Sequence, residues 1–274
     1  MYINNSIAQA YILGEDMRQY EKEWFFSGST LDVDRGKNIF TLPPDDNAAR
    51  DEVKKLIKHF QYGVEHFEPV NRPVWDKLFP DWQKIQPVID LIVGFPEPYD
   101  AVTMRGTDGQ IHLVFDLICW RKYAGMADLD KIIRNLLTHE ITHLLIGKNY
   151  PDVDMAMEST DYRTKLDAYT FHEGFAHLIS YQATELDHVD WHTEQLKEVY
   201  SSCKEKMCAA LTETDTKKQE QYLYDAICGM YYEKFACMCG MLYLAGQWEK
   251  YGIPGLKTAF MDYHGFAERT LDEN

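Results

Sequence analysis

The chain has 274 residues, enough for one large domain or two lobes, and its 45% hydrophobic content is that of an ordinary globular protein. Its 44 acidic and 28 basic side chains give a formal net charge of −16. This excess of acid argues against a nucleic-acid partner, because phosphates are neutralised by Lys and Arg, and against binding to anionic membranes.

The N-terminal third is predicted to be mostly helical. Apolar residues recur at helical spacing over 6–25, and Asp45 and Asp46 precede a second apolar stripe that runs to about His66. The segment 69–87 contains four Pro, which favours short helical turns or irregular structure.

Between about 88 and 119 the hydrophobic pattern changes to that of strands. The runs 88–93 and 101–105 are rich in strand-forming residues, 106–109 has the composition of a tight turn, and 111–117 partly alternates. We expect a small sheet that contains a hairpin.

From Asp128 onward the pattern is helical again. Asp128 can cap a helix whose apolar residues cover most of its circumference and which Gly147 can end, so this helix is expected to be buried. The segments that follow are a predicted loop at 148–162 and predicted helices at 164–182, 189–212, 218–250 (with a possible break near Gly229) and 254–263. We expect one domain over 1–274 in two lobes, an N-terminal lobe (1–127) with the sheet and a helical C-terminal lobe (128–274).

The termini and cysteines favour a cytoplasmic location. The N-terminus has no basic and apolar leader, and no run approaches the length of a membrane span. None of the six Cys forms a CxxC pair, and we expect free thiols that are mostly buried.

One pentapeptide in the buried helix carries chemistry: His139-Glu140-Ile141-Thr142-His143. Two His four residues apart lie one turn apart on one helical face, so their imidazoles can converge on a single metal ion. Zinc is the expected metal, and Glu140 can reach a water bound to it. A metal also satisfies both His, which would otherwise be costly to bury.

A catalytic zinc ion requires a third protein ligand and an open position. Ile146 and Asn149 stand where metzincins have Gly and His, so that class is excluded. The better candidate is Glu173 on the next helix, where the helical stripe turns it inward and the small Gly174 and Ala176 permit close approach to the first helix. Rival ligands are His177, His172 and an acidic residue within 152–167.

The HExxH motif followed by a helical Glu173-Gly174-Phe175-Ala176 resembles the gluzincins, the thermolysin-like zinc metallopeptidases, over about 128–182. The resemblance implies that His139, His143 and Glu173 bind one zinc ion and that Glu140 activates water as general base. Some gluzincins have an Asp where this chain has His177. His177, like His172, is therefore expected either to support a zinc-bound His or to act as an alternative ligand.

Two further site predictions come from the same resemblance. The hairpin looks like the edge strand on which these enzymes pair their substrate, so His112 and Val114 are expected to hold an extended peptide, with a plain sheet strand as the alternative. The segment 231–240 is similar to the terminal helices of several peptidase-MA-like proteins. Gluzincins often use a downstream Tyr or His to stabilise the oxyanion, which makes Tyr231 or Tyr232 the candidate and plain packing the alternative.

The sequence thus predicts a zinc metallopeptidase that acts on a peptide or protein. Its expected fold is α+β, predominantly helical and zincin-like, with a small antiparallel or mixed sheet packed on the HExxH helix. The alternatives are a zincin-like binding module without proteolytic activity, a zinc hydrolase of a non-peptide bond, and a helical protein with an accidental motif. Cleavage specificity and oligomeric state stay open.

Overall fold

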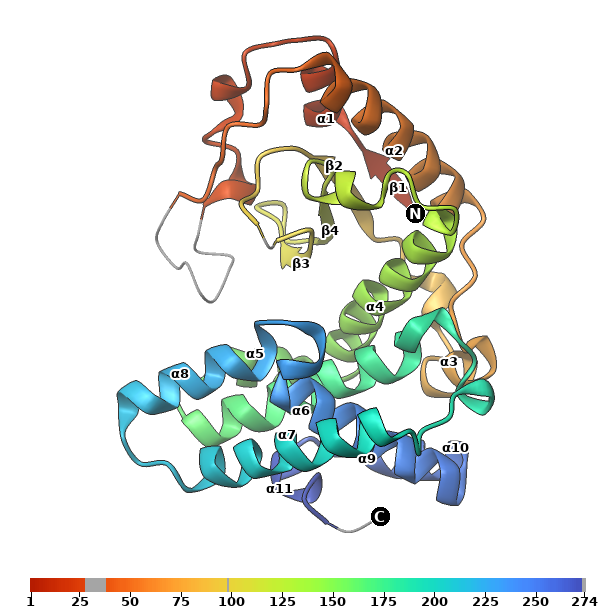
Figure 1. The fold of residues 1–274 in the computed structure, drawn as a ribbon, viewed down its shortest axis with the longest axis vertical. Coiled ribbons are helices and arrows are strands. Elements are labelled where there is room, and N and C mark those ends of the chain that lie inside the picture. Colours follow the sequence, from red (N-terminus) through yellow and green to blue (C-terminus); the bar gives the residue numbers. More distant parts are fainter. Residues whose placement is uncertain (28–37, 98, 273–274) are drawn as a thin grey trace. The chain divides into compact units, whose positions relative to one another are not determined.

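The computed structural model describes residues 1–27, 38–97 and 99–272 (Figure 1). The chain forms two compact units, the first made of Met1–Pro69 and Gln83–Ile141 and the second of Val70–Trp82 and Thr142–Asn274. The boundary falls inside helix α4 (Leu129–Asn149) instead of at 127/128, so both units share the helix that carries the HExxH motif.

The first unit is built on a mixed sheet of four strands in the order β1-β2-β4-β3. β2 runs parallel to both β1 and β4, whereas β3 and β4 form the antiparallel hairpin that the sequence predicts. Helix α1 packs on α2 and on β2. The strands and helices of this unit that precede α4 are β1 (Tyr2–Asn4), α1 (Ser6–Ile12), α2 (Asn47–Glu65), β2 (Val88–Ile92), β3 (Ala101–Arg105) and β4 (Ile111–Asp116).

The two N-terminal helices differ in how well the sequence predicts them. Helix α2 is confirmed, because Asp46 caps it by accepting a hydrogen bond from the Ala49 amide and its whole apolar stripe is buried. The predicted helix over 6–25 is wrong beyond Ile12. Gly14 follows with a φ of +77°, and only short 3₁₀ turns come after it.

β4 is an interior strand, so the prediction that 111–117 forms a sheet edge is wrong. Val114 pairs with Asp90 of β2 on one side and with Val102 of β3 on the other, and it is fully buried. His112 is buried as well. The hairpin sequence shows only one neighbour of β4, because the other, β2, is separated from it along the chain. The outermost strand beside β4 is β3.

The second unit is helical, with α6 at its centre. α6 packs against α5, α8, α9 and α11, and α7 packs on α9 (Figure 1). Besides the end of α4, its helices are α3 (Arg72–Leu78), α5 (Pro151–Met157), α6 (Tyr162–Ser180), α7 (Glu194–Thr212), α8 (Thr216–Ile227), α9 (Phe235–Tyr251), α10 (Ile253–Phe260) and α11 (Phe266–Arg269).

For this unit one prediction is confirmed and two need correction. The polar segment 148–162, expected to be a loop, contains α5, which begins at Pro151 with two Asp in its first turn. The break near Gly229 is confirmed, since Gly229 has a φ of +115° and separates α8 from α9. Helix α4 continues two residues beyond Gly147, which was expected to end it.

Residues 70–82 belong to the helical unit because their side chains bond to it. The side-chain Nδ2 of Asn71 donates to the backbone carbonyl oxygens of Ile179 (2.8 Å) and Thr184 (3.1 Å), and its Oδ1 accepts from the backbone amide of Leu186 (2.7 Å). These bonds fix α3 to the end of α6, where sequence periodicity offers no signal.

Gly174 permits a close helix contact, but its partner is α9 and not the HExxH helix as expected. A Cβ atom on Gly174 would lie 2.8 Å from the Cα of Gly240, and one on Gly240 would collide with the Thr170 carbonyl. The backbones of α6 and α9 therefore touch directly at these two glycines.

In its coarser form the predicted fold class is confirmed, since the chain is predominantly helical with a small mixed sheet. All six Cys are free, and four of them are buried. Among the described residues, no helix has both the length and the apolar character needed to cross a bilayer.

Candidate metal centre

Helix α4 presents the two motif histidines one turn apart. His139 lies in the part of α4 that belongs to the first unit and His143 in the part that belongs to the second, and the continuity of the helix places them on one face. Ile141 and Leu145 of the same helix are almost fully buried, as expected for a core helix.

Glu173 on α6 lies between two histidines. Its Oε1 is 3.6 Å from Nε2 of His143, and its Oε2 is 3.5 Å from Nε2 of His177. Donor atoms that share a tetrahedral zinc ion with bonds of about 2.0–2.2 Å lie about 3.3 Å apart. Both separations are therefore close to those of donors that share one ion.

Within the second unit the structure brings together His143 and Glu173, both expected as ligands. It adds His177, expected as a support or alternative ligand, at the other carboxylate oxygen of Glu173. His139, the remaining expected ligand, belongs to the first unit and is joined to His143 through helix α4.

The protonation states of the cluster suit a metal. Burial by itself would raise the pKa of Glu173, but the charges of His143, His177 and Lys234 outweigh it and hold that pKa below its ordinary value. Burial lowers the pKa of His177 to about 4, although the Glu173 carboxylate acts in the opposite direction. At neutral pH the cluster thus offers a carboxylate and a neutral imidazole, the forms that coordinate metals.

His172 contacts the second motif histidine from the other side. Its Nδ1 lies 2.6 Å from Nδ1 of His143, and the two rings are stacked with an interplanar angle of 12°. A separation of 2.6 Å is that of a hydrogen bond and is too short for two ligands of one zinc ion. The geometry therefore favours His172 as a support for His143 over His172 as a rival ligand.

Glu140 is held by a residue that sequence reasoning missed. The Thr103 hydroxyl on β3 donates a hydrogen bond of 2.6 Å to Oε2 of Glu140, whose residue is only 6% exposed. The bond engages one of the two carboxylate oxygens and fixes the side-chain rotamer. A Thr in a short strand gives no signal of this contact, because the pairing joins residues 37 positions apart.

The two tyrosine candidates lie close to His177 and Tyr181. The Tyr231 ring centroid is 5.2 Å from that of His177, and the Tyr232 hydroxyl is 3.2 Å from that of Tyr181, which the sequence did not single out. Desolvation, together with Tyr181 and Tyr232, raises the pKa of Tyr231 well above its ordinary value. Tyr231 is therefore a neutral phenol at physiological pH and can donate a hydrogen bond.

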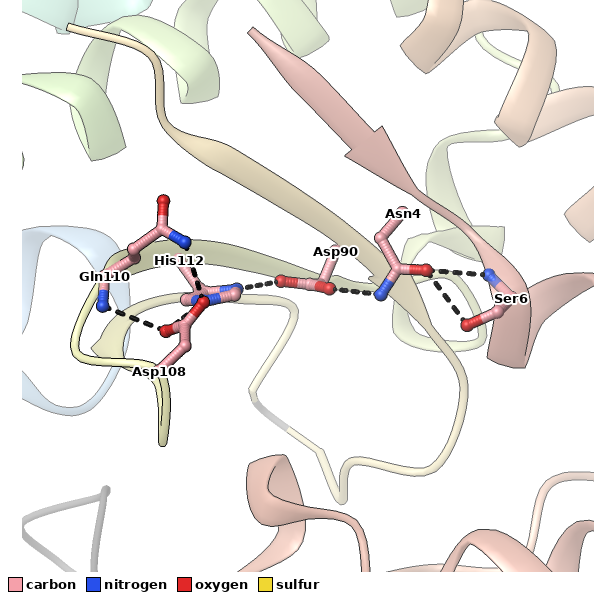
Figure 2. A network of polar contacts seen from close by, with 6 residues as sticks. All are labelled: Asn4, Ser6, Asp90, Asp108, Gln110 and His112. Carbon is pink, nitrogen blue, oxygen red and sulfur yellow. Dashed lines mark hydrogen bonds and ion pairs between the residues drawn. The ribbon is translucent and has the colours of Figure 1, made fainter.

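His112 belongs to a separate polar network in the first unit (Figure 2). Its Nδ1 lies 2.5 Å from Oδ2 of Asp90, its Nε2 lies 3.2 Å from Oδ1 of Asp108, and the Asn4 amide donates to Asp90. The network ties β1, β2 and the hairpin turn to β4. Since β4 also has a strand on each side, the predicted peptide pairing of His112 and Val114 has no sheet edge to use.

Comparison with known proteins adds nothing to these contacts: no family model, no curated protein and no solved structure matches the chain. The gluzincin resemblance thus depends on the motif residues alone.

Proposed function

We propose that this protein is a zinc-dependent metallopeptidase with a zincin-like fold. His139, His143 and Glu173 hold one zinc ion, and Glu140 is the general base. The observation that carries the proposal is the position of Glu173, which lies on the second helix after the HExxH helix and faces Nε2 of His143 and of His177 at 3.6 and 3.5 Å.

The donor set supports zinc. Neutral imidazoles and a carboxylate are the ligands of open catalytic zinc sites, and three protein ligands leave a position for water. The side chains of Glu173 and His177 are 23% and 7% exposed, so the cluster is largely shielded yet accessible to a small substrate group. His177 is the alternative to His143, because its Nε2 lies as close to Glu173 as that of His143 does.

The chemistry is hydrolysis of a peptide bond. When bound, zinc lowers the pKa of a coordinated water towards 7 and polarises the scissile carbonyl. Glu140, held by Thr103, accepts the water proton and passes it to the leaving amine. The Tyr231 phenol donates a hydrogen bond to the developing oxyanion.

β3 is the strand we assign to substrate pairing in place of β4. It is the outermost strand beside β4, and it carries Thr103, which bonds to Glu140. A peptide that pairs with β3 by strand addition therefore runs close to the general base.

The variant Glu140→Gln tests the proposal together with metal analysis. We expect the purified wild type to bind one equivalent of zinc and to cleave members of a proteome-derived peptide mixture. Glu140→Gln should keep the zinc and lose about 10²- to 10⁴-fold in cleavage rate, the usual contribution of a general base. Glu198→Gln, an exposed change on α7, is the matched control and should cleave like the wild type.

Two results would contradict the proposal. A wild type with no affinity for zinc removes every zinc-dependent function, and equal turnover by wild type and Glu140→Gln removes the proposed base. Zinc binding without cleavage of any peptide would favour the binding-module alternative.

A further inference from the structure

His172 has one ring nitrogen, Nε2, that its contact with His143 leaves without a hydrogen bond. The residue is 4% exposed, and its Nδ1 is engaged with Nδ1 of His143. Its Nε2 is buried and makes no hydrogen bond to any described residue. Leaving a buried polar atom unsatisfied is costly, so such atoms are uncommon and require a physical reason.

The group that faces this atom is the carboxylate of Asp154 on α5. Asp154 Oδ1 lies 3.7 Å from Nε2 of His172, too far for a hydrogen bond as it stands. The Asp154 side chain is 39% exposed, and such a carboxylate can turn towards a donor at little cost. Asp154 is therefore placed to accept a hydrogen bond from His172 after a small rotation.

Gly147 on α4 makes the approach of Asp154 possible. A Cβ atom at position 147 would lie 2.6 Å from Oδ1 of Asp154 and closer still to Oδ2. Gly147 is one helical turn after His143, so the carboxylate occupies space beside the same face of α4. Three helices thus bring Asp154, His172 and His143 together within the second unit.

The hydrogen bond between the two histidines can run in either direction. If neutral His172 donates from Nδ1, its bare Nε2 lone pair faces the Asp154 carboxylate, which is repulsive. His143 then carries its proton on Nε2, the atom that faces Glu173. If His143 donates instead, His172 presents Nε2–H to Asp154, which is attractive, and the bare Nε2 of His143 faces the Glu173 carboxylate at 3.6 Å, an arrangement that becomes favourable when a cation lies between them.

We propose that Asp154 is a positioning residue that favours the second direction, the one in which Nε2 of His143 is free to bind zinc. Acting through His172, it stabilises the Nδ1–H tautomer of His143 and so opposes the attraction of Glu173 for a proton on Nε2. The proposal deepens the proposed function, on which it rests for the role of His143 as a metal ligand.

The tautomer can be measured without any metal. In two-bond ¹H–¹⁵N spectra of chelator-treated protein at neutral pH, we expect His143 to show a larger fraction of the Nδ1–H tautomer in the wild type than in Asp154→Ala. Asp152→Ala removes a carboxylate from the same turn of α5 but from an exposed position, so it should keep the wild-type spectrum. An equal Nδ1–H fraction in the wild type and Asp154→Ala would overturn the proposal.

Zinc affinity, measured by competition with a chromogenic chelator, is the second readout. Loss of a group that orients a metal-bound His typically weakens metal binding by about 10- to 100-fold, which is the effect expected for Asp154→Ala. Asp152→Ala should stay within about twofold of the wild type, since it leaves the metal's surroundings unchanged. Equal affinities for the two variants would refute the role of Asp154 and leave the proposed zinc site intact.

Gly147→Ala separates positioning from stability. Ala is favoured over Gly within a helix, so this variant should fold at least as stably as the wild type. Its Cβ nevertheless takes the place of the Asp154 carboxylate, and we expect zinc affinity to fall as in Asp154→Ala. Undiminished affinity would count against the proposal. A wild type that binds no zinc would refute the proposed function, and the spectra alone would then decide the role of Asp154.

Discussion

Replacing Thr103 by Val tests whether β3 positions Glu140, the proposed general base. The Thr103 hydroxyl donates to Oε2 of Glu140 at 2.6 Å, and Glu140 is 6% exposed, so water can replace the lost bond only in part. Val has nearly the same size and shape as Thr but no donor, so the change removes the hydrogen bond with little change in packing.

The distance sets the size of the effect. At 2.6 Å this is a short hydrogen bond to a charged acceptor, a class that contributes about 1.5–3 kcal/mol. If that energy is needed to hold the base in its reactive position, kcat/KM should fall by between about tenfold and 150-fold, since about 1.4 kcal/mol is a factor of ten. Thr103→Ser keeps the hydroxyl and should lose no more than about threefold.

The assay is steady-state cleavage of a peptide that the wild type hydrolyses, with zinc content measured in the same samples. Thr103 is not among the residues that could bind the metal, so the zinc content of all three proteins should be equal. Wild-type kinetics in Thr103→Val, or equal losses in the Val and Ser variants, would refute the reasoning.

Two predictions concern stability, measured by urea unfolding of the metal-free protein. Because burial lowers the pKa of His177 to about 4 from an ordinary 6.5, the unfolded chain binds a proton that the folded chain does not as pH falls between these values. The free energy of unfolding of the wild type should therefore fall as the pH is lowered from 6.5 to 4, and that of His177→Asn should fall by about 3 kcal/mol less. Equal pH dependence of the two free energies would contradict this. Gly174→Ala should lower the free energy of unfolding by about 1–3 kcal/mol, because the new Cβ meets the backbone of Gly240. Gly125→Ala, whose Cβ would meet nothing, is its control, and equal effects would contradict the close contact of α6 and α9.

Local signals explain what the sequence could predict. The capping Asp46 and the apolar stripe that follows it define α2 within 20 residues, and the spacing of His139 and His143 places them on one face of any helix. The inward position of Glu173 follows from the period of α6 in the same way. Each of these predictions needs only the chain on either side of the residue.

The failures involve partners that are distant along the chain. β4 was expected at an edge because its parallel neighbour β2 is separated from it along the chain by β3, so the local sequence gives no sign of the pairing. β2 in turn pairs with the N-terminal strand, where Asn4 bonds to Asp90, 86 positions away. Gly174 signalled a close approach correctly, but the small residue by itself could not tell α4 from α9 as its partner.

The rivals for the third ligand show a different limit. His172 and Glu173 are adjacent on α6 and point about 100° apart, which from sequence makes them alternatives. In the structure both contact His143, because an imidazole presents its two nitrogens at opposite edges: Nδ1 meets His172, and Nε2 meets Glu173. An imidazole held at Nδ1 has only Nε2 to offer a metal, so under the proposed function the residue that supports His143 and the residue that shares its ion are needed together. Two neighbouring side chains that sequence analysis ranks as competitors would then act jointly, and removing either should weaken the proposed metal site.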